Sequence, residues 1–342
     1  HRDLHKEYRR QRQMCIRDRR YLVWVGFFGL VAILFVSLFI ESEGRLYDGL
    51  LEFDEFTKFF RIFFLIIGGV TVIISREYVD SRLKYPGEYY GILLFTLLGA
   101  MLLASSAELL TAYINLELLS FGLYVLVGYE RYNPKSNEAS VKYILLGAFS
   151  SALILFGISQ IYGLLGTTRF DEMSVAFSSL SSISPGMAVG FVLIVSGLGF
   201  KLAAVPFHMW APDVYEGAPL PITAWLSVGS KAAALALAIR LFSEGFISVF
   251  GELQPILIVI AAITMVIGNL LALVQKNIKR LLAYSSIGHV GYLLMGLAAL
   301  VPIAKTGSVA ETFTNLVYNG LLFHMVSYGF TTMACLLYTS DA

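Results

Sequence analysis

Long apolar segments alternate with short polar segments along most of the chain. A helix rises 1.5 Å per residue, so about 20 apolar residues span a hydrocarbon core of roughly 30 Å. The pattern therefore predicts ten membrane-spanning helices, which lie at about Tyr21–Ile40, Phe56–Ser75, Tyr89–Ser106, Leu109–Tyr129, Val141–Leu165, Pro185–Val205, Ile222–Phe242, Pro255–Val274, Leu281–Leu300 and Phe313–Ala334.

The charges between these segments alternate in sign, and this supports the count of spans. One set of loops contains Arg76, Arg82 and Lys84; then Arg131, Lys135 and Lys142; then Lys276, Lys279 and Arg280. The loops between them contain Glu41, Glu43, Asp48, Asp54 and Glu55; then Asp171 and Glu172; then Glu244 and Glu252. The positive-inside rule places the first set in the cytoplasm. The loop Phe207–Pro221, on the same predicted side, has no Lys or Arg and is therefore not expected to be an ordinary loop.

Composition narrows the class of protein. Of the 342 residues, 57% are hydrophobic and only 14% are charged, whereas soluble domains contain about 25% charged residues. The mean hydropathy is +0.72. We therefore predict an all-α, polytopic membrane helix bundle. A net charge of +1 gives no field suited to nucleic acid.

Both cysteines lie near the ends of the chain, in stretches that resemble translated sequencing adapters. These stretches are "RQMCIRDR", which contains Cys15, and "CLLYTSDA", which begins at Cys335. We expect residues 1–20 to be a non-native basic leader, residues 21–334 to form the transmembrane domain, and residues 335–342 to be a non-native tail. The alternative is a basic cytoplasmic arm and the end of a last helix. Neither disulfide nor metal site is predicted from two such distant cysteines.

Few ionisable residues lie inside the predicted spans, and each requires an explanation. A charged residue at the centre of a membrane helix costs about 2.5–3.5 kcal/mol on insertion scales. These residues are Glu117, Lys201, Lys231, His289 and His324.

Three of them lie on polar stripes of otherwise apolar helices, because their polar neighbours recur at helical spacing. Such stripes are expected to face the bundle interior or a hydrated cavity rather than lipid. The stripes are Tyr113, Glu117, Ser120 and Tyr124; Thr223, Ser227 and Lys231; and Ser285, His289 and Tyr292.

A proline lies next to one of these charges, in "GFKLAAVPFHMWAPD". Pro206 cannot donate to the carbonyl of Leu202 and its ring crowds that turn, so the helix is expected to break. Broken helices at membrane depth are typical of ion sites in transporters. Lys201 and His208 lie on either side of the predicted break.

Simpler interpretations remain open for single residues. Lys201 or Lys231 alone fits a structural ion pair, Glu117 alone fits a hydrogen-bonding role, and His289 alone fits a packed histidine. Arg240, near a helix end, is expected to extend to the membrane surface. The sequence contains no glycine-rich phosphate loop in a βαβ context, no Cys/His cluster for zinc or iron–sulfur, and no haem motif.

Taken together, several stretches resemble the antiporter-like membrane subunits of respiratory complex I, NADH-quinone oxidoreductase, and the "PDVYEGAP" portion is most similar to its subunit N branch. The resemblance covers most of residues 21–334. It is carried by "FKLAAVPFHMWAPDVYEGAPLPITAWLSVGSKAA", "NLELLSFGLYVLVGY", "EASVKYILLGAFSSALILFG" and "QKNIKRLLAYSSIGHVGYLLMG".

The resemblance implies about fourteen helices in two inverted repeats, each with a broken helix. It implies that Glu117 is the carboxylate of the family's fifth helix, Lys201 the lysine of the broken seventh, and Lys231 the bridging lysine of the eighth. His208 and His289 would help to connect them. The family's second broken helix and terminal lysine are expected beyond Ala334, so the second repeat is truncated and this chain alone is not expected to pump.

By this resemblance we expect a proton-translocating, multi-pass subunit of the bacterial plasma membrane. NADH, FMN, iron–sulfur clusters and quinone would be bound by partner subunits, and this chain would bind no cofactor. Its partners would be other membrane subunits of the complex, lipid, water and protons. The alternatives are a Mrp-type cation/proton antiporter subunit and a scaffold subunit that has lost pumping.

Overall fold

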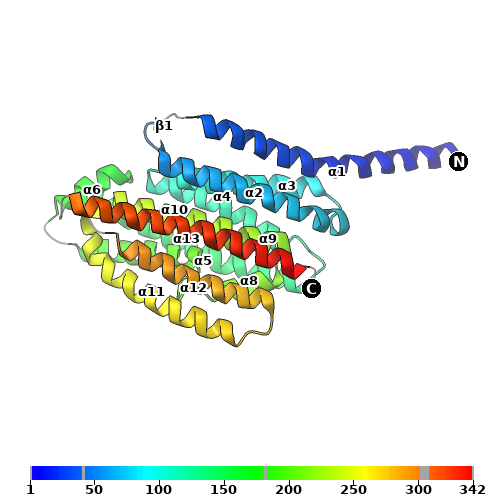
Figure 1. Cartoon of the computed structure of the whole chain (residues 1–342). Coiled ribbons are helices and arrows are strands. Elements are labelled where there is room, and N and C mark those ends of the chain that lie inside the picture. Colours follow the sequence, from blue (N-terminus) through cyan, green and yellow to red (C-terminus); the bar gives the residue numbers. More distant parts are fainter. Residues whose placement is uncertain (1, 41–42, 181–182, 301–307, 341–342) are drawn as a thin grey trace.

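Helices make up almost all of the chain in the computed structural model (Figure 1). Among the described residues, ten helical segments are long and apolar enough to cross a membrane, which confirms the predicted spans and the all-α fold class. The structure describes the backbone of residues 2–40, 43–180, 183–300 and 308–340, and the side chains of residues 21–40, 43–180, 183–300 and 315–338.

The helical elements follow one another with short connections. They are α1 (Arg2–Phe39), α2 (Glu55–Arg82), α3 (Pro86–Ala104), α4 (Leu109–Val127), α5 (Pro134–Leu165), α6 (Phe170–Ser178), α7 (Pro185–Leu202), α8 (Trp210–Gly217), α9 (Leu220–Trp225), η1 (Leu226–Ser230), α10 (Lys231–Arg240), η2 (Leu241–Gly245), η3 (Ile247–Val249), α11 (Phe250–Leu273), α12 (Ile278–Ala298) and α13 (Ser308–Ser340).

One span occupies the centre of the bundle. The segment Leu220–Gly245, which runs from α9 through η2, is buried along the whole of its most apolar stretch. By contrast, only 17% of that stretch is buried in Tyr21–Phe39 and 22% in Ile247–Leu273, so α1 and α11 present apolar side chains outward. An apolar helix that its neighbours cover on all sides lies in the interior of the bundle. Helices with apolar side chains on their outer face are suited to contact with lipid.

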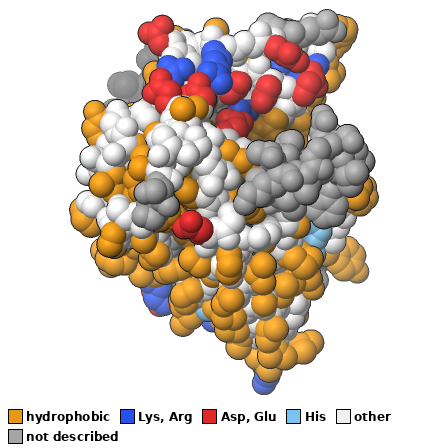
Figure 2. Space-filling view, turned by 90° about the vertical axis from the view of Figure 1, so that its left-hand side faces the viewer, with side chains coloured by type: hydrophobic (Ala, Val, Ile, Leu, Met, Phe, Trp, Pro, Cys, Tyr) orange, Lys and Arg blue, Asp and Glu red, His pale blue; other side chains and the backbone are white. Residues whose placement is uncertain are grey.

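The charged loops gather at two opposite ends of the bundle, as their alternation predicts. Cations from three of the predicted cytoplasmic loops line one cavity of about 1270 Å³: Arg76, Arg82, Lys135 and Lys279. The acidic loops meet at the other end, which Figure 2 views directly: acidic and basic side chains gather there, with hydrophobic side chains along the flank. The loops of each set lie at the same end of the bundle. The structure therefore confirms that the prediction missed no span between successive loops.

A short hairpin at this acidic end lies within a segment that the sequence pattern predicts as loop. Strand β1 (Gly44–Leu46) pairs antiparallel with β2 (Leu51–Phe53), with Gly44 opposite Phe53. Gly49, in the connecting turn, has a φ of 85°, which a residue without Cβ adopts at little cost. Strands of three residues are too short for alternation to predict.

The predicted break after Lys201 is present, and α7 ends there with a defined cap. Ala203 adopts a left-handed conformation (φ 60°), and its N–H donates to the carbonyl of Phe200 (2.9 Å). The N–H of Ala204 donates to the carbonyl of Gly199 (2.7 Å). This pair of bonds is the Schellman arrangement that ends many helices. The helix therefore stops at Leu202, three residues before the predicted end of the span.

The chain beyond the break is held by two further hydrogen bonds. The N–H of Val205 donates to the hydroxyl of Thr264 on α11 (3.0 Å), and the indole of Trp210 donates to the carbonyl of Phe200 (2.8 Å). The Val205–Pro206 peptide bond is cis. The cation-free loop then folds into α8, which explains why its composition differs from that of the other loops.

The predicted domain boundaries fall partly outside the described side chains. The backbone of residues 2–20 is continuous with α1, but the side chains of residues 1–20, including Cys15, lie outside the described residues, as do residues 341–342. Cys335 is exposed on α13.

Candidate functional site

The first polar centre surrounds Lys201, the penultimate residue of α7. Its ammonium nitrogen lies 3.6 Å from Oε1 of Glu117 on α4, and both side chains are largely buried, at 7% and 13% exposed. The ammonium also donates to the hydroxyls of Ser120 (2.9 Å), Ser151 (3.3 Å) and, at longer range, Tyr124 (3.5 Å). Ser151 in turn donates to Glu117. The predicted stripe of α4 therefore does face into the bundle.

Ser151, on α5, was not among the residues that the sequence indicates. It lies in a run of small and apolar residues, and its role depends on the packing of α5 against α7 and α4. Lys201 also lies at the C-terminal end of its helix, where the helix dipole favours a positive charge. The break at Leu202 therefore stabilises the ammonium electrostatically as well as ending the helix.

The second polar centre surrounds Lys231 in the central span. Lys231 is 1% exposed, and its ammonium donates to the hydroxyl of Ser286 on α12. Tyr328 on α13 donates to the same hydroxyl (2.7 Å) and lies 3.1 Å from the carbonyl of Ser227. No carboxylate among the described side chains pairs with Lys231. A buried ammonium without a counter-ion is costly, and such a group favours exchange of its proton.

The backbone before Lys231 departs from a regular α-helix. Residues Leu226–Ser230 form a π-helical turn, and such turns occur frequently at functional sites. No sequence signal predicts it. The predicted stripe of this helix does face the interior, because Thr223 and Ser227 are both 0% exposed. Their hydroxyls donate to the carbonyls of Tyr215 and Ala224, respectively, and not to groups at Lys231.

Two histidines lie beside the second centre. Nδ1 of His289 lies 3.2 Å from Nε2 of His324, and the His289 ring is 5.0 Å from that of Tyr328. No role is predicted for His324 from the sequence, but in the structure its ring lies against that of His289. The α12 stripe is shifted by one residue from the prediction, since Ser286 rather than Ser285 reaches Lys231. Ser285 and Ser286 lie four and three residues before His289, and either spacing places a serine on the same helix face as the histidine. The sequence pattern therefore could not distinguish the two serines.

His208 is buried just beyond the break, and its Nδ1 has no hydrogen-bond partner among the described residues. Burial lowers the pKa of the His208 ring, with a smaller opposing effect from the Pro206 backbone, and this favours the neutral ring. Within the described part of the chain, no hydrogen bond joins His208 to either lysine. The expected connecting role of His208 stays a prediction.

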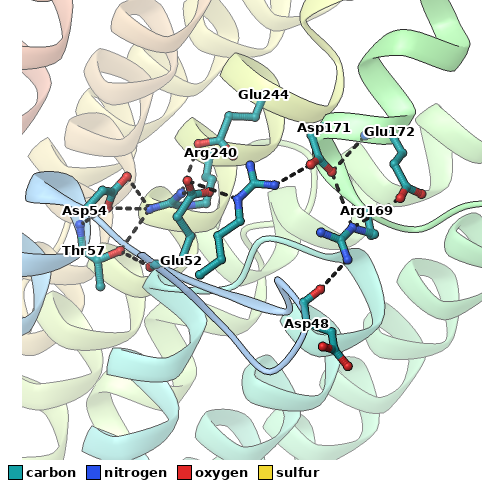
Figure 3. A network of polar contacts seen from close by, with 10 residues as sticks. Asp48, Glu52, Asp54, Thr57, Arg169, Asp171, Glu172, Arg240 and Glu244 are labelled. Carbon is teal, nitrogen blue, oxygen red and sulfur yellow. Dashed lines mark hydrogen bonds and ion pairs between the residues drawn. The ribbon is translucent and has the colours of Figure 1, made fainter. Parts of the chain in front are cut away.

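Arg240 points toward the acidic end of the bundle, where loops cover its side chain. Its side chain is 1% exposed and binds Asp54 (2.9 and 3.0 Å), Glu52 (3.3 Å) and Glu244 (3.1 Å), as well as the hydroxyl of Thr57 (Figure 3). The carboxylates come from the hairpin, from the loop before α2 and from its own helix. Sequence position alone could not show that these loops fold back over the end of the central span.

This acidic-end network continues away from Arg240. Arg45 lies 3.7 Å from Glu52 and 2.6 Å from Asp171, which is in the first turn of α6. Arg169 then contacts Asp171 (3.6 Å) and donates to the carbonyl of Asp48. The hairpin, α6 and the central span are thus joined by one set of ion pairs (Figure 3).

The two lysine centres and the broken helix lie within a segment that matches a known family. Residues 106–339 match the transmembrane family described as NADH:quinone oxidoreductase/Mrp antiporter. The chain belongs to this family. A subunit N of NADH-quinone oxidoreductase from Trichlorobacter lovleyi is 42% identical over 318 residues, which are 92% of this chain and 62% of that protein.

Solved structures agree on the antiporter fold. A chain of respiratory complex I from Thermus thermophilus superposes with a TM-score of 0.75 at 31% identity, over 93% of this chain and 64% of that one. A chain of the Mrp complex from Dietzia sp. gives 0.69 at 18% identity, over 95% and 74%, which shows the shared fold alone. This antiporter-family chain spans about 62% of the length of the curated relatives it matches.

Cofactor ligands are not evident in the part of the chain that the structure describes. No group of three or more His, Cys, Asp or Glu side chains there could hold a metal ion. What the arrangement supplies chemically is a buried carboxylate–ammonium pair and a second buried ammonium, each surrounded by hydroxyl groups that can donate and accept protons.

Proposed function

We propose that this antiporter-family chain is part of a proton-translocating membrane subunit of NADH-quinone oxidoreductase, of the subunit N type. The observation that carries the proposal is the contrast between the two buried lysines: Lys201 is paired with Glu117 at 3.6 Å, whereas Lys231 contacts a neutral hydroxyl. The two lysines therefore differ in their affinity for a proton, and a displacement of Glu117 can reverse this difference.

In this mechanism the proton resides on Lys201 while Glu117 is close. If a neighbouring subunit draws Glu117 away, the Lys201 ammonium loses its compensating charge and releases its proton toward Lys231. Each pKa unit corresponds to about 1.4 kcal/mol, so a displacement of a charge by a few ångströms is sufficient. Pro206 and the break allow the two halves of the helix to move separately, and His208 and His289 would help the proton to pass.

The redox chemistry would belong to partner subunits. NADH, FMN, iron–sulfur clusters and quinone would be bound there, and this chain would supply the transfer of protons in a bacterial plasma membrane. The other membrane subunits of the complex would be its partners. A Mrp-type cation/proton antiporter subunit is the second candidate, but the identity to subunit N proteins (42%) exceeds that to the Mrp chain (18%).

The test is Lys201→Ala in the full-length subunit, within the assembled complex in proteoliposomes. Lys58→Ala is the matched control, because Lys58 also lies on a spanning helix but pairs with the exposed Glu55. We expect Lys201→Ala to lower the number of protons pumped per electron while NADH:quinone reduction can still be measured, and Lys58→Ala to leave the ratio unchanged.

A second variant separates function from folding. Lys201→Ala leaves Glu117 buried without a partner, so the double change Lys201→Ala with Glu117→Gln removes both charges and should assemble more readily. An unchanged proton-to-electron ratio in an assembled double variant would contradict the proposed function.

A further inference from the structure

Tyr215 has a buried hydroxyl that the site as described does not use. It lies on α8 within "PDVYEGAP", its exposure is 0%, and its hydroxyl has no hydrogen-bond partner among the described residues. A buried hydroxyl without a full hydrogen bond is costly, so its presence requires an explanation. A phenylalanine would fill the same space without this cost.

On one side, Tyr215 faces the second lysine centre. The Lys231 ammonium lies 5.6 Å from the centre of the Tyr215 ring. The Tyr215 hydroxyl is near enough to that of Ser286 for a weak hydrogen-bond interaction, and near enough to Tyr328 for an electrostatic one. These are the two residues whose hydroxyls already meet at Lys231. The orphan hydroxyl is therefore next to the lysine that lacks a counter-ion.

On the other side, a second buried tyrosine leads to the first centre. Tyr143 on α5 packs edge-on against Tyr124 (4.6 Å between ring centres), and Tyr124 contacts Lys201. The Tyr143 ring also stacks on Trp210 of α8, the helix that carries Tyr215. Buried tyrosines on three different helices therefore lead from the Lys201 centre to α8.

The break in the seventh helix is what brings Tyr215 into this position. Trp210, at the start of α8, stacks on Tyr143 at 4.7 Å and donates its indole N–H to the carbonyl of Phe200 in α7. An unbroken helix would continue past this point and would leave no segment to carry a tyrosine between the centres. Helix α8 also packs against both α5 and α12, which carry Ser151 and Ser286.

We propose that the Tyr215 hydroxyl is a proton-relay group between the Lys201 and Lys231 centres. The inference rests on the function proposed above. A proton released by the Lys201 ammonium would pass Tyr143, directly or through water, and reach a lone pair of the Tyr215 oxygen. Tyr215 would give its own hydrogen to the amine of Lys231, so that the tyrosine ends neutral and Lys231 becomes the ammonium.

The test compares Tyr215→Phe with Tyr90→Phe in the full-length subunit of the assembled complex. Tyr90 is 4% exposed and its hydroxyl also lacks a partner, but it lies on α3, away from both lysines. The control therefore removes the same atom at similar burial. We expect Tyr215→Phe to lower the initial pumping rate in proteoliposomes by at least about tenfold, since positioned proton-transfer groups contribute about 10²–10⁴-fold.

The outcomes separate this inference from the proposed function. Wild-type pumping by an assembled Tyr215→Phe complex, together with loss in Lys201→Ala, would overturn the relay and leave the proposed function in place. Wild-type pumping by both variants would overturn both. If Tyr215→Phe does not assemble, 3-fluorotyrosine at position 215 keeps the shape and makes the phenol more acidic. A pumping rate whose pH profile is then unchanged would overturn the relay, and a shifted profile would support it.

Discussion

The two buried lysines are stabilised by different means, and this difference sets the direction of transfer. Lys201 has a carboxylate at 3.6 Å and the C-terminal end of α7 beside it. Lys231 has a hydroxyl and the face of an aromatic ring. A carboxylate compensates a buried ammonium far better than neutral dipoles do. The resting proton is therefore expected on Lys201, and the transfer requires that the Glu117 pair open first.

Arg240 shows the reverse situation, because one buried cation there holds several carboxylates together. We predict that Arg240→Met destabilises the protein by about 3–5 kcal/mol, the range for breaking a buried ion pair. Removal of the guanidinium leaves Asp54, Glu52 and Glu244 close together without their shared partner. Thermal unfolding of the purified full-length protein in detergent would measure the loss.

The control for this prediction is Arg45→Met in the same network. Arg45 is 45% exposed, and exposed pairs contribute about 0–1 kcal/mol, so a small effect is expected. Adding Asp54→Asn to Arg240→Met should recover part of the stability by removing a repelling charge. Equal losses from Arg240→Met and Arg45→Met would show that burial of the network does not matter.

At the scale of elements, α8 is attached to the bundle by ion pairs on its outer side. Asp213 binds Lys142 (2.7 Å) and Arg280 (2.6 Å), and Glu216 binds Arg280 (3.2 Å) and Lys135 (3.0 Å). The acids are on α8 and the cations on α5 and α12. The one predicted cytoplasmic loop without cations is therefore the acidic partner of the cations around it.

These acids make the attachment of α8 dependent on pH. Burial would raise the pKa of Asp213, but its bonds to Lys142 and Arg280 outweigh this and lower it from 3.8. The bond from Lys135 is the main cause that lowers the pKa of Glu216 from 4.5. A lowered pKa means stability that is present above the unfolded value and is lost as the pH falls through the folded value.

We therefore predict that the double change Asp213→Asn with Glu216→Gln destabilises the protein at pH 7, and that this difference shrinks as the pH falls below the ordinary carboxyl values of 3.8 and 4.5 toward the lower folded values. The two acids form four partly exposed pairs, and if each contributes about 0.2–1 kcal/mol, the loss at pH 7 is about 1–4 kcal/mol. Melting temperatures of both proteins between pH 7 and pH 3 would measure it. If the difference in melting temperature stays constant over this range, the prediction is contradicted, because the stability would then not depend on the charge of the two carboxylates.

The elements themselves were predictable from local pattern, but the contacts between them were not. Runs of about 20 apolar residues were sufficient to locate the spans, and the proline in "AAVPF" was sufficient to indicate the break. Glu117, Ser120 and Tyr124 were predictable because helical spacing puts them on one face. Ser151, Tyr215 and the Arg240 network depend on which helices pack together, and a single sequence carries no local signal for that.

At the scale of the whole molecule, charge separates the two ends of the bundle while apolar side chains cover its flanks. The cation-lined cavity lies at the end where α8 is attached, and the Arg240 network lies at the end with the hairpin and α6 (Figures 1 and 2). The positive-inside rule predicts an orientation with the α8 end toward the cytoplasm.

This orientation can be tested with two positions that are highly exposed at opposite ends. Tyr47, in the hairpin turn, is 73% exposed, and Tyr132, before α5, is 85% exposed. Helices α2, α3 and α4 lie between them, and an odd number of spans places them on opposite sides of a membrane. In a background with Cys15→Ser and Cys335→Ser, a membrane-impermeant maleimide should label Tyr47→Cys in intact spheroplasts and Tyr132→Cys in inside-out vesicles. Labelling of both from one side would mean that one of the three helices does not cross. The reverse pattern would keep the span count but invert the orientation, and protons entering at the α8 end would then come from outside the cell.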